Sequence, residues 1–402
     1  MKRINLLYTL FLINVPLIIN GQEKKDTTSI LHAFRKGKIE GHFRLFYMGT
    51  NNDESLTDYY ALAFGGSLKY QTGSFKGFQF GIGGSYAFNL SSSDLTIPDP
   101  TTRIMNRYEM GLFDQTNPSN KKDLQRLEDF YFKYNFRRSF IKYGKQTIKT
   151  PFINPQDGRM SPTVVQGAWI EVNELNKTKI EIGWLSQISP RSTVKWYNGA
   201  SSIGIYPAGA AINGIKSDYK DQLDSKGIAI AGVTYSLNEQ IKLRMWDHLV
   251  ENIFNTALLQ ADGEFSIEGN RKIIASVQYI HQQAVSEGGN TDPAKTYFDP
   301  SQKVNIYGAR AGLEFRTTTI RLNYTRMSND GRFLFPREWG REPLFTFLPR
   351  ERNEGLGGVN AISVNFFKRY FRQRLNAEIS AGYYELPDVK DTRLNKYGLP
   401  SY

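Results

Sequence analysis

Basic side chains recur at alternate positions within apolar segments of this 402-residue chain. Each has at least one apolar residue as its neighbour in sequence: Lys69, Lys133, Lys242, Arg244, Arg310, Arg316 and Arg321. If these segments are strands in a bilayer, a lysine or arginine facing lipid would cost about 2–4 kcal/mol near the midplane. We therefore expect these residues to face water, where rows of positive charge raise the local concentration of anionic or carboxylate-bearing solutes.

A structural role is the alternative interpretation of these basic residues. They can form ion pairs across neighbouring strands with Glu128, Asp129, Glu181 and Glu314, or bind lipopolysaccharide phosphates near a membrane rim. The formal net charge of +12 favours an anionic solute, but it leaves both interpretations open.

The segment from Tyr143 to Gly167 has a different composition. Its prolines are Pro151, Pro155 and Pro162. Because proline lacks the N–H donor that a central strand requires, the chain must leave the sheet here and form an ordered loop. Asp157 and Arg159 are spaced to form an ion pair within that loop.

Long strands are the elements predicted to position these residues. In Tyr59–Thr72 and Gly77–Leu90, large apolar residues alternate with small or polar ones. Since side chains of a strand point to opposite faces with period two, each segment has one apolar face and one small, polar face. Both runs exceed ten residues and carry Tyr or Phe near their ends, which is typical of bilayer-spanning strands. We expect the apolar face to meet lipid and the other face to meet a lumen.

The same alternation recurs along the chain and predicts roughly sixteen strands. Further strands are expected within 39–48, 130–136, 180–184, 231–237, 241–246, 273–279, 307–316, 320–324, 361–367 and 377–386, and less clearly within 255–265. Long polar connections lie at 91–125, 189–226, 282–302 and 328–358. The predicted fold class is therefore all-β: a transmembrane antiparallel β-barrel of about 16–18 strands, with long extracellular loops and short periplasmic turns. A barrel of that size encloses an aqueous channel, which implies passive passage of small solutes.

Aromatic residues are frequent in the connection at 328–358. They are Phe333, Phe335, Trp339, Phe345 and Phe347. They predict an ordered loop that either folds into the mouth of the barrel or caps its rim, and the sequence leaves these two arrangements open.

The N-terminus predicts an export signal. Lys2 and Arg3 precede an apolar stretch that ends at Ile19, and Gly21 is a small residue at a suitable cleavage position. A membrane-anchoring helix is the alternative, but the stretch falls short of about 20 apolar residues and contains Pro16. We expect a signal peptide at 1–21, a periplasmic lead-in at 22–38, a barrel at 39–402 and a location in the Gram-negative outer membrane. The absence of cysteine fits export through an oxidising periplasm.

The chain resembles the OprD-type outer-membrane porins. The residues that carry the resemblance are Gly144-Lys145-Gln146, Pro151, Asp157, Arg159, Pro162, Gly167 and the segment Asn395–Pro400. The resemblance implies an 18-stranded channel for small, often carboxylate-bearing nutrients, with a basic track on the barrel wall. It also implies that residues 151–162, including Asn154 and Pro155, fold inward as a constriction, with Lys145 and Arg159 on its basic side. Lys145 stands where the family more often has arginine, so a point charge replaces a bidentate donor.

The C-terminus departs from the barrel pattern. Tyr402 is aromatic, as the barrel-assembly machinery is expected to require, but residues 397–401 do not form an amphipathic strand. Because the matching motif precedes further strands in the family, we expect the sequence given to end before the final strands.

Other chemistry has little support in the sequence. The histidines His32, His42, His248 and His281 show no metal-ligand spacing, and no motif marks a Ser-His-acid set. Closely spaced glycines at 81–84 and 355–358 do not open a helix after a strand, as a phosphate site requires. A barrel strand explains the interleaved aromatic and basic residues of 130–145 without nucleic acid. We therefore predict no enzyme, metal, cofactor or nucleic-acid partner.

The expected partners follow from the barrel. They are outer-membrane lipid and lipopolysaccharide, the barrel-assembly machinery and small solutes, and the protein is expected to be a monomer or a trimer. The alternative function is an occluded barrel that binds or anchors through its surface loops.

Overall fold

The computed structural model of the chain consists almost entirely of antiparallel strands. It describes residues 11–19, 26–106, 108–156, 158–206, 209–349, 353–371 and 374–402. Within these ranges, sixteen strands are longer than two residues. Every strand pair with an assigned register is antiparallel, as the alternating sequence predicts.

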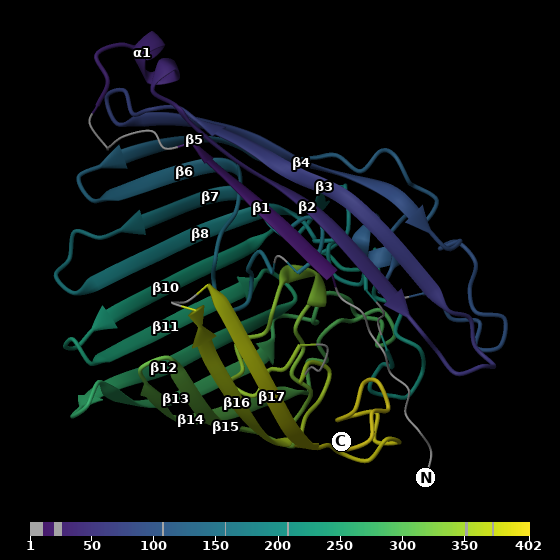
Figure 1. Ribbon diagram of the computed structural model, residues 1–402. Coiled ribbons are helices and arrows are strands. Elements are labelled where there is room, and N and C mark those ends of the chain that lie inside the picture. Colours follow the sequence, from purple (N-terminus) through teal and green to yellow (C-terminus); the bar gives the residue numbers. More distant parts are fainter. Residues whose placement is uncertain are drawn as a thin grey trace. The chain divides into compact units, whose positions relative to one another are not determined.

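The chain forms two compact units, which are described separately. The first consists of Met1–Ala168, Ser186–Tyr197 and Glu338–Gly340. Its strands are β2 (Lys38–Thr50), β3 (Tyr59–Gln71), β4 (Phe78–Ser92), β5 (Arg126–Phe136) and β6 (Ser139–Gln146). Each of these strands pairs with the next one along the chain (Figure 1). The predicted strands at 39–48, 59–72 and 77–90 are thereby confirmed as β2, β3 and β4.

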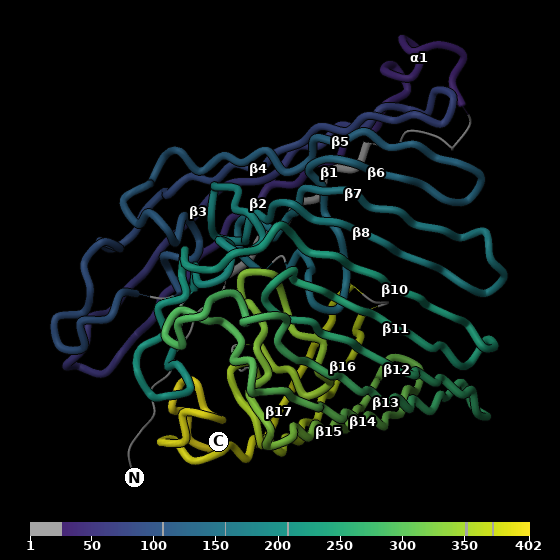
Figure 2. The backbone as a smooth tube through the Cα atoms, turned by 180° about the vertical axis from the view of Figure 1, so that it is seen from behind, coloured from purple at the N-terminus to yellow at the C-terminus, as the bar shows by residue number. Residues whose placement is uncertain are grey.

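The second unit consists of Trp169–Leu185, Asn198–Arg337 and Arg341–Tyr402. Its strands are β10 (Ile228–Ser236), β11 (Ile241–Val250), β12 (Phe254–Ile267), β13 (Arg271–Ala284), β14 (Lys303–Phe315), β15 (Thr318–Met327), β16 (Asn360–Tyr370) and β17 (Leu375–Glu385). The strands β7 (Val164–Val172), β8 (Thr178–Ser189) and β9 (Tyr197–Asn198) contribute residues to both units. Figure 2 shows β10 to β15 following one another in chain order. β12, which alternation predicted less clearly, is a strand of 14 residues.

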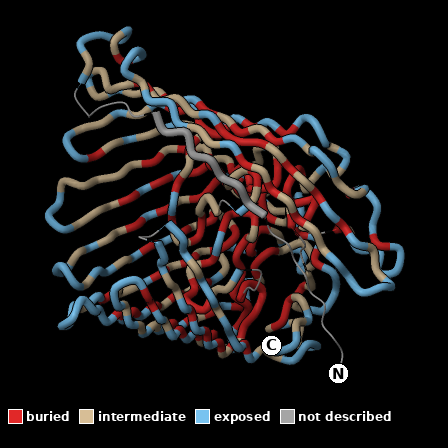
Figure 3. Tube along the Cα trace, in the orientation of Figure 1, coloured by how far each residue is buried: buried red, intermediate tan, exposed pale blue. Residues whose placement is uncertain are grey.

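The burial pattern of the strands is the reverse of that of a soluble sheet. Along β3, the small residues Ala61 and Ala63 are completely buried, whereas Leu68 is 62% exposed. Buried and exposed residues alternate in this way along the strands (Figure 3). We call the face with small and polar side chains the covered face, and the face with large exposed side chains the apolar face. Large apolar side chains that point outward need an apolar surrounding, which is what the alternation predicts.

The N-terminal region contributes one helix and one strand to the described residues. The predicted lead-in contains α1 (Ile30–Arg35), whose N-cap Ser29 accepts a hydrogen bond from the backbone N–H of His32 at 3.1 Å. The strand β1 (Phe11–Ile19) pairs with β2. The rest of the predicted signal peptide lies outside the described residues, and its cleavage stays a prediction. No helix in the described ranges is both long enough and apolar enough to cross a membrane.

Candidate functional site

Lysines from three strands lie on the covered face of the first unit. Lys69 of β3 forms an ion pair with Asp129, with 2.7 Å between Nζ and Oδ2. Lys142 of β6 lies opposite Lys133 of β5, and its Nζ lies 3.9 Å from the centre of the Tyr131 ring. Lys133 also lies over an aromatic ring. Lys69 therefore has a carboxylate partner, whereas Lys142 forms no ion pair with any carboxylate that the structure describes.

A register shift concentrates further charge on this face. In the pairing of β4 with β5, Asp129 lies opposite Gly83 and Leu127 lies opposite Gly84. The shift is a β-bulge, which lets two consecutive residues turn to the same side of a strand. Glu128 and Asp129 are consequently both buried on the covered face.

Arg126 is a buried anchor on the same face. Its guanidinium forms an ion pair with Glu128, with 2.8 Å between Nη2 and Oε1. It donates from Nη1 to the carbonyls of Pro190 and Thr193, and from Nη2 to the carbonyl of Pro162. One side chain thus ties two irregular segments to β5, and one of them contains a residue of the predicted constriction.

The loop between β4 and β5 folds over the covered face of the first unit. One buried cluster joins residues of this loop to residues of β2 and β3: Leu95, Leu112 and Phe113 with Phe46, Met48, Ala61 and Ala63. Part of the loop forms the short 3₁₀ helix η1 (Met110–Leu112). Met160, from the predicted constriction, packs into the same cluster. Two loops, rather than the 151–162 segment alone, therefore lie on this face.

A hydrogen-bonded turn around Asp99 lies within this loop. Asp99 accepts hydrogen bonds from the backbone N–H groups of Thr102 and Thr57, at 2.7 Å each. These bonds favour the carboxylate and lower the pKa of Asp99 from its ordinary value of 3.8 to about 2.

The pH dependence of this turn follows from that lowered pKa. Because folding lowers the pKa, the stabilisation is complete above pH 3.8 and is lost as the pH falls toward about 2. We expect the Thr57 and Thr102 amides to lose hydrogen-exchange protection over this range, after correction for intrinsic exchange rates. In an Asp99→Asn variant, the protection of these amides should depend little on pH. Equal pH dependence in the variant and the wild-type protein would show that the Asp99 carboxylate is not its cause.

The predicted constriction segment connects β6 to β7, as expected from its prolines. The residues named for it are all half-buried: Pro151, Asn154, Pro155 and Pro162. Within the first unit, the backbone N–H of Asn154 donates to the carbonyl of Trp339 at 3.0 Å, and the hydroxyl of Thr163 donates to the carbonyl of Glu338 at 3.0 Å. The segment is therefore an ordered loop fixed at both ends.

Arg159 is held by the neighbouring loop. Its Nη1 donates to the carbonyl of Tyr108 at 2.6 Å, and its own carbonyl accepts a hydrogen bond from Arg44 of β2. Asp157 lies outside the described residues, so the Asp157–Arg159 pair stays a prediction.

Lys145 lies at the end of β6 with a different partner. Its Nζ lies 3.4 Å from the centre of the Trp196 ring, a cation–π contact. The preceding residue, Gly144, has φ +125°, and a Cβ there would lie 2.2 Å from the carbonyl oxygen of Phe130. Glycine is therefore required at this bend, which sets the direction of the strand end that carries Lys145.

In the second unit, most of the predicted basic residues lie at positions of the covered face. They are Lys242 and Arg244 on β11, Arg310 on β14 and Arg321 on β15. Arg244 pairs with Asp262 at 2.6 Å, and Arg310 donates from Nε to Asn323 at 2.7 Å. Arg316 is the exception, because β14 ends one residue before it. It lies exposed in the turn to β15, contrary to the prediction that it lies within a strand.

The loop between β15 and β16 folds onto the covered face of the second unit. Gln282 of β13 exchanges two hydrogen bonds with the backbone of Leu334, at 2.8 and 2.9 Å. Farther along the loop, the ring of Phe345 lies 4.3 Å from the guanidinium carbon of Arg310. Of the two arrangements expected for these aromatic residues, the structure favours the inward fold.

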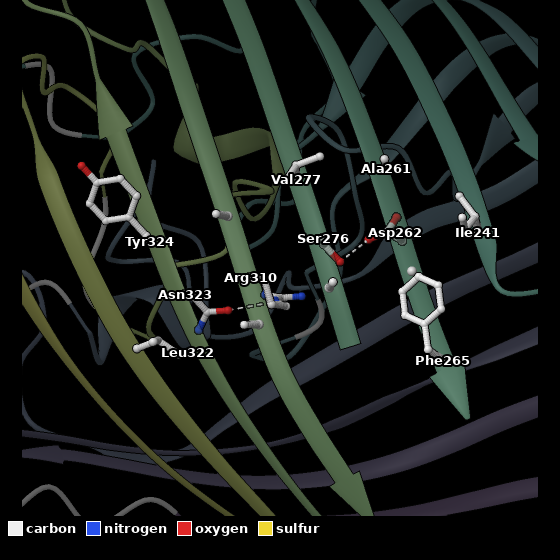
Figure 4. A pocket seen from close by; sticks show the side chains of 14 residues that line it. Ile241, Ala261, Asp262, Phe265, Ser276, Val277, Arg310, Leu322, Asn323 and Tyr324 are labelled. Carbon is white, nitrogen blue, oxygen red and sulfur yellow. Dashed lines mark hydrogen bonds between the residues drawn. The ribbon is translucent and has the colours of Figure 1, made fainter. Parts of the chain in front are cut away.

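A cavity of about 430 Å³ lies on the second unit, and its lining is largely apolar (Figure 4). Small side chains such as Ala261 line it, and Phe265, Leu322 and Tyr324 surround them. Leu322 and Tyr324 are exposed and belong to the apolar face of β15. This cavity suits hydrocarbon rather than a charged solute, so it does not define the solute site.

Several residues of this site were missed by the sequence analysis. They are Arg44, Arg126, Lys142 and Trp196. Arg44 and Lys142 alternate with apolar neighbours in the same way as the predicted basic residues, so their position in the pattern could have identified them. For Arg126 and Trp196 the sequence holds no comparable signal, because loops bring their partners to them.

Comparison with known proteins identifies the family of this chain. Residues 37–355 match the family model described as "outer membrane porin, OprD family". A search among curated proteins finds no match.

Solved structures of porins share the fold at low sequence identity. OccK8 (OprE) of Pseudomonas aeruginosa is 16% identical with a TM-score of 0.68, covering 87% of this chain and 85% of that one. OccD3 (OpdP) of the same organism is 12% identical with a TM-score of 0.65, covering 90% and 76%. OpdK of Pseudomonas aeruginosa, in a crystal structure with vanillate, is 14% identical with a TM-score of 0.65, covering 87% and 83%.

These findings confirm the predicted fold class, a transmembrane antiparallel β-barrel, and the outer-membrane location. Because the strands of such a barrel turn their apolar residues to lipid, the apolar face is the lipid side and the covered face is the lumen side. Porins of this family are channels rather than enzymes. The chain belongs to the OprD family of outer-membrane porins.

Proposed function

We propose that this porin passes small anionic solutes, chiefly those that bear a carboxylate, through a lumen lined by basic residues. The observation that carries the proposal is a set of cations on the covered faces: Lys142, Arg310 and Arg321. Each contacts an aromatic ring, and none forms an ion pair with a described carboxylate. Cations that are not neutralised attract solute carboxylates, and guanidinium groups can bind them in a bidentate manner.

Inward-folded loops support a narrowed lumen. In the first unit, the loops at 93–125 and 147–163 share the buried cluster on the covered face. In the second, Phe345 lies over Arg310. We propose that the segment 151–162 of the first unit forms the constriction, with Lys145 and Arg159 on its basic side, so that a solute passes charged groups at close range.

The likeness to OpdK supports the solute class. That porin was crystallised with vanillate, an aromatic carboxylate. The likeness in sequence is too low to transfer the ligand itself, so only the chemical class is proposed for this chain.

Liposome swelling tests this proposal. Proteoliposomes containing the full chain should take up a small benzoate faster than an uncharged sugar of similar size. Replacing Lys142, Arg310 and Arg321 by glutamine should reduce that preference by about threefold or more, since one charge at 4 Å in water contributes about 1 kcal/mol. A matched control replaces three exposed lysines, Lys36, Lys121 and Lys122, by glutamine. An unchanged preference in the first variant would contradict the proposal.

The alternative is an occluded barrel that binds or anchors through its loops. Correctly folded protein that gives no swelling with any solute would favour it.

We also propose a signal peptide at 1–21, contacts with lipopolysaccharide and with the assembly machinery, and a monomeric or trimeric state. Each is expected of an outer-membrane barrel.

A further inference from the structure

The short helix α1 exposes three large apolar side chains. Ile30 and Leu31 are each 62% exposed, and Phe34 is 50% exposed. Phe34 lies four residues after Ile30 and three after Leu31, so in a helix its side chain is adjacent to both. We call these three side chains the α1 patch. An apolar surface of this kind is unfavourable in water, so it indicates an apolar partner.

Hydrogen bonds fix α1 against the turn between β3 and β4. The carbonyl of Ala33, a buried residue of the helix, accepts a hydrogen bond from the N–H of Gly73 at 2.9 Å. Just before the helix, the N–H of Thr27 donates to the carbonyl of Ser74 at 2.7 Å. The helix is therefore held in place through its buried side, and the α1 patch stays outside.

The α1 patch continues the apolar face of the first unit. The ring of Phe34 is stacked on that of Tyr70, with 6.5 Å between the ring centres, and the Tyr70 hydroxyl donates to the carbonyl of Phe34. Tyr70 shares a face of β3 with Leu68 and lies opposite Ile39 of β2. Leu68 and Ile39 are both exposed. Because lipid covers this face of the strands, the lipid-covered surface extends from them to α1.

Aromatic residues indicate the depth of α1 in the membrane. Tyr70, Phe78 and Tyr134 lie within three residues of the ends of β3, β4 and β5, beside the short turns 72–77 and 137–138. Phe78 and Tyr134 are exposed, with 4.7 Å between their ring centres. Aromatic residues at the ends of barrel strands lie at the level of the lipid headgroups, and short turns belong to the periplasmic side. Since Phe34 contacts Tyr70, α1 lies at the headgroup level of the periplasmic leaflet.

We propose that α1 is an interfacial helix, which inserts Ile30, Leu31 and Phe34 among the phospholipids of the periplasmic leaflet. An amphipathic helix in the plane of a membrane buries its apolar side at the boundary between headgroups and acyl chains. Arg35 is exposed next to the patch, where its guanidinium can donate to a lipid phosphate. The inserted helix fixes the periplasmic ends of β2 and β3. This role depends on the outer-membrane barrel but not on the solute that passes through it.

Spin labels test the position of α1 directly, because the chain has no cysteine of its own. One label is attached to Leu31→Cys and another to Lys36→Cys, an exposed position about 140° around the helix from Leu31. In the full chain in phospholipid nanodiscs, the label at 31 should be more accessible to oxygen, which concentrates in hydrocarbon, than to a water-soluble nickel chelate. The label at 36 should show the reverse.

Two results of the labelling would overturn the proposal. High accessibility of the label at 31 to the nickel chelate would show that the α1 patch lies in water. Low accessibility of this label to both reagents would show that protein, from the same or a second copy of the chain, covers the patch in place of lipid.

Hydrogen exchange provides an independent test without a label. The N–H of Ala33 donates to the carbonyl of Ser29 at 2.9 Å and reports on the helix. In nanodiscs, Leu31→Ser should lower the protection of this amide by about tenfold, because it removes an apolar side chain from lipid. Lys36→Ser is the matched control, since leucine and lysine have similar helix propensities. An equal loss of protection in the two variants would contradict insertion into lipid.

Discussion

Replacing Arg126 by methionine is expected to lower the free energy of unfolding by about 3–5 kcal/mol. The change leaves Glu128 buried without its cation, because the two side chains form a 2.8 Å ion pair and each is only 1% exposed. It also removes the donor to the carbonyls of Pro162, Pro190 and Thr193. Urea unfolding of the refolded protein in detergent micelles measures the loss.

A double variant separates the two effects of this change. In Arg126→Met with Glu128→Leu, no buried charge remains, so part of the lost stability should return. The hydrogen bonds to the loops stay broken in both variants. If the Arg126→Met variant and the wild-type protein had equal free energies of unfolding, this result would contradict the anchoring role of Arg126.

Replacing Phe345 by alanine is expected to loosen the inward-folded loop of the second unit and to raise the single-channel conductance. Phe345 is buried, and truncation of a buried phenylalanine costs about 3–5 kcal/mol. Its ring also covers the guanidinium of Arg310, which the variant would open to the lumen. Planar-bilayer recording of the two proteins under the same salt conditions measures the change.

Phe347 offers a matched control in the same loop. Its ring lies over Arg341 and is only half-buried, so Phe347→Ala removes an equal side chain with less packing. We expect a smaller rise in conductance from it. An unchanged conductance in the Phe345 variant would show that this loop does not limit the lumen.

The strands and their faces were predictable because alternation is a local property of the sequence. The 59–72 and 77–90 segments differ from β3 and β4 by two residues or fewer at each end. The length of the runs and the outward direction of residues such as Leu68 follow from period two and from the thickness of a bilayer.

Irregular backbone limited the prediction of the charged residues. The bulge in β5 places Glu128 and Asp129 on one face, although consecutive residues of a regular strand point to opposite faces. Arg316 continues the alternation of β14 by one residue, but the chain has already turned there. Neither the bulge in β5 nor the end of β14 interrupts the alternating pattern of the sequence. Alternation alone could therefore not predict either of them.

The arrangement of the loops could not be derived from the sequence. Prolines predicted that the chain leaves the sheet within 143–167, and this is confirmed: residues 147–163 lie between β6 and β7. Which loops fold onto the covered faces depends on interactions between distant residues. In the first unit, Met160 joins the buried cluster that contains Leu112, and in the second unit Leu334 forms hydrogen bonds with Gln282. Lys145 and Arg159 were grouped by resemblance, yet the structure gives them different partners, Trp196 and Tyr108.

Reversal potential in a planar bilayer tests the central claim most directly. The full chain, refolded and inserted under a salt gradient, should form discrete channels that favour anions, and added small carboxylates should reduce the current. Replacing Lys142, Arg310 and Arg321 by glutamine should lower the anion preference by about threefold or more. A cation-selective channel would contradict the basic lumen, and correctly folded protein without any channel would contradict solute passage altogether.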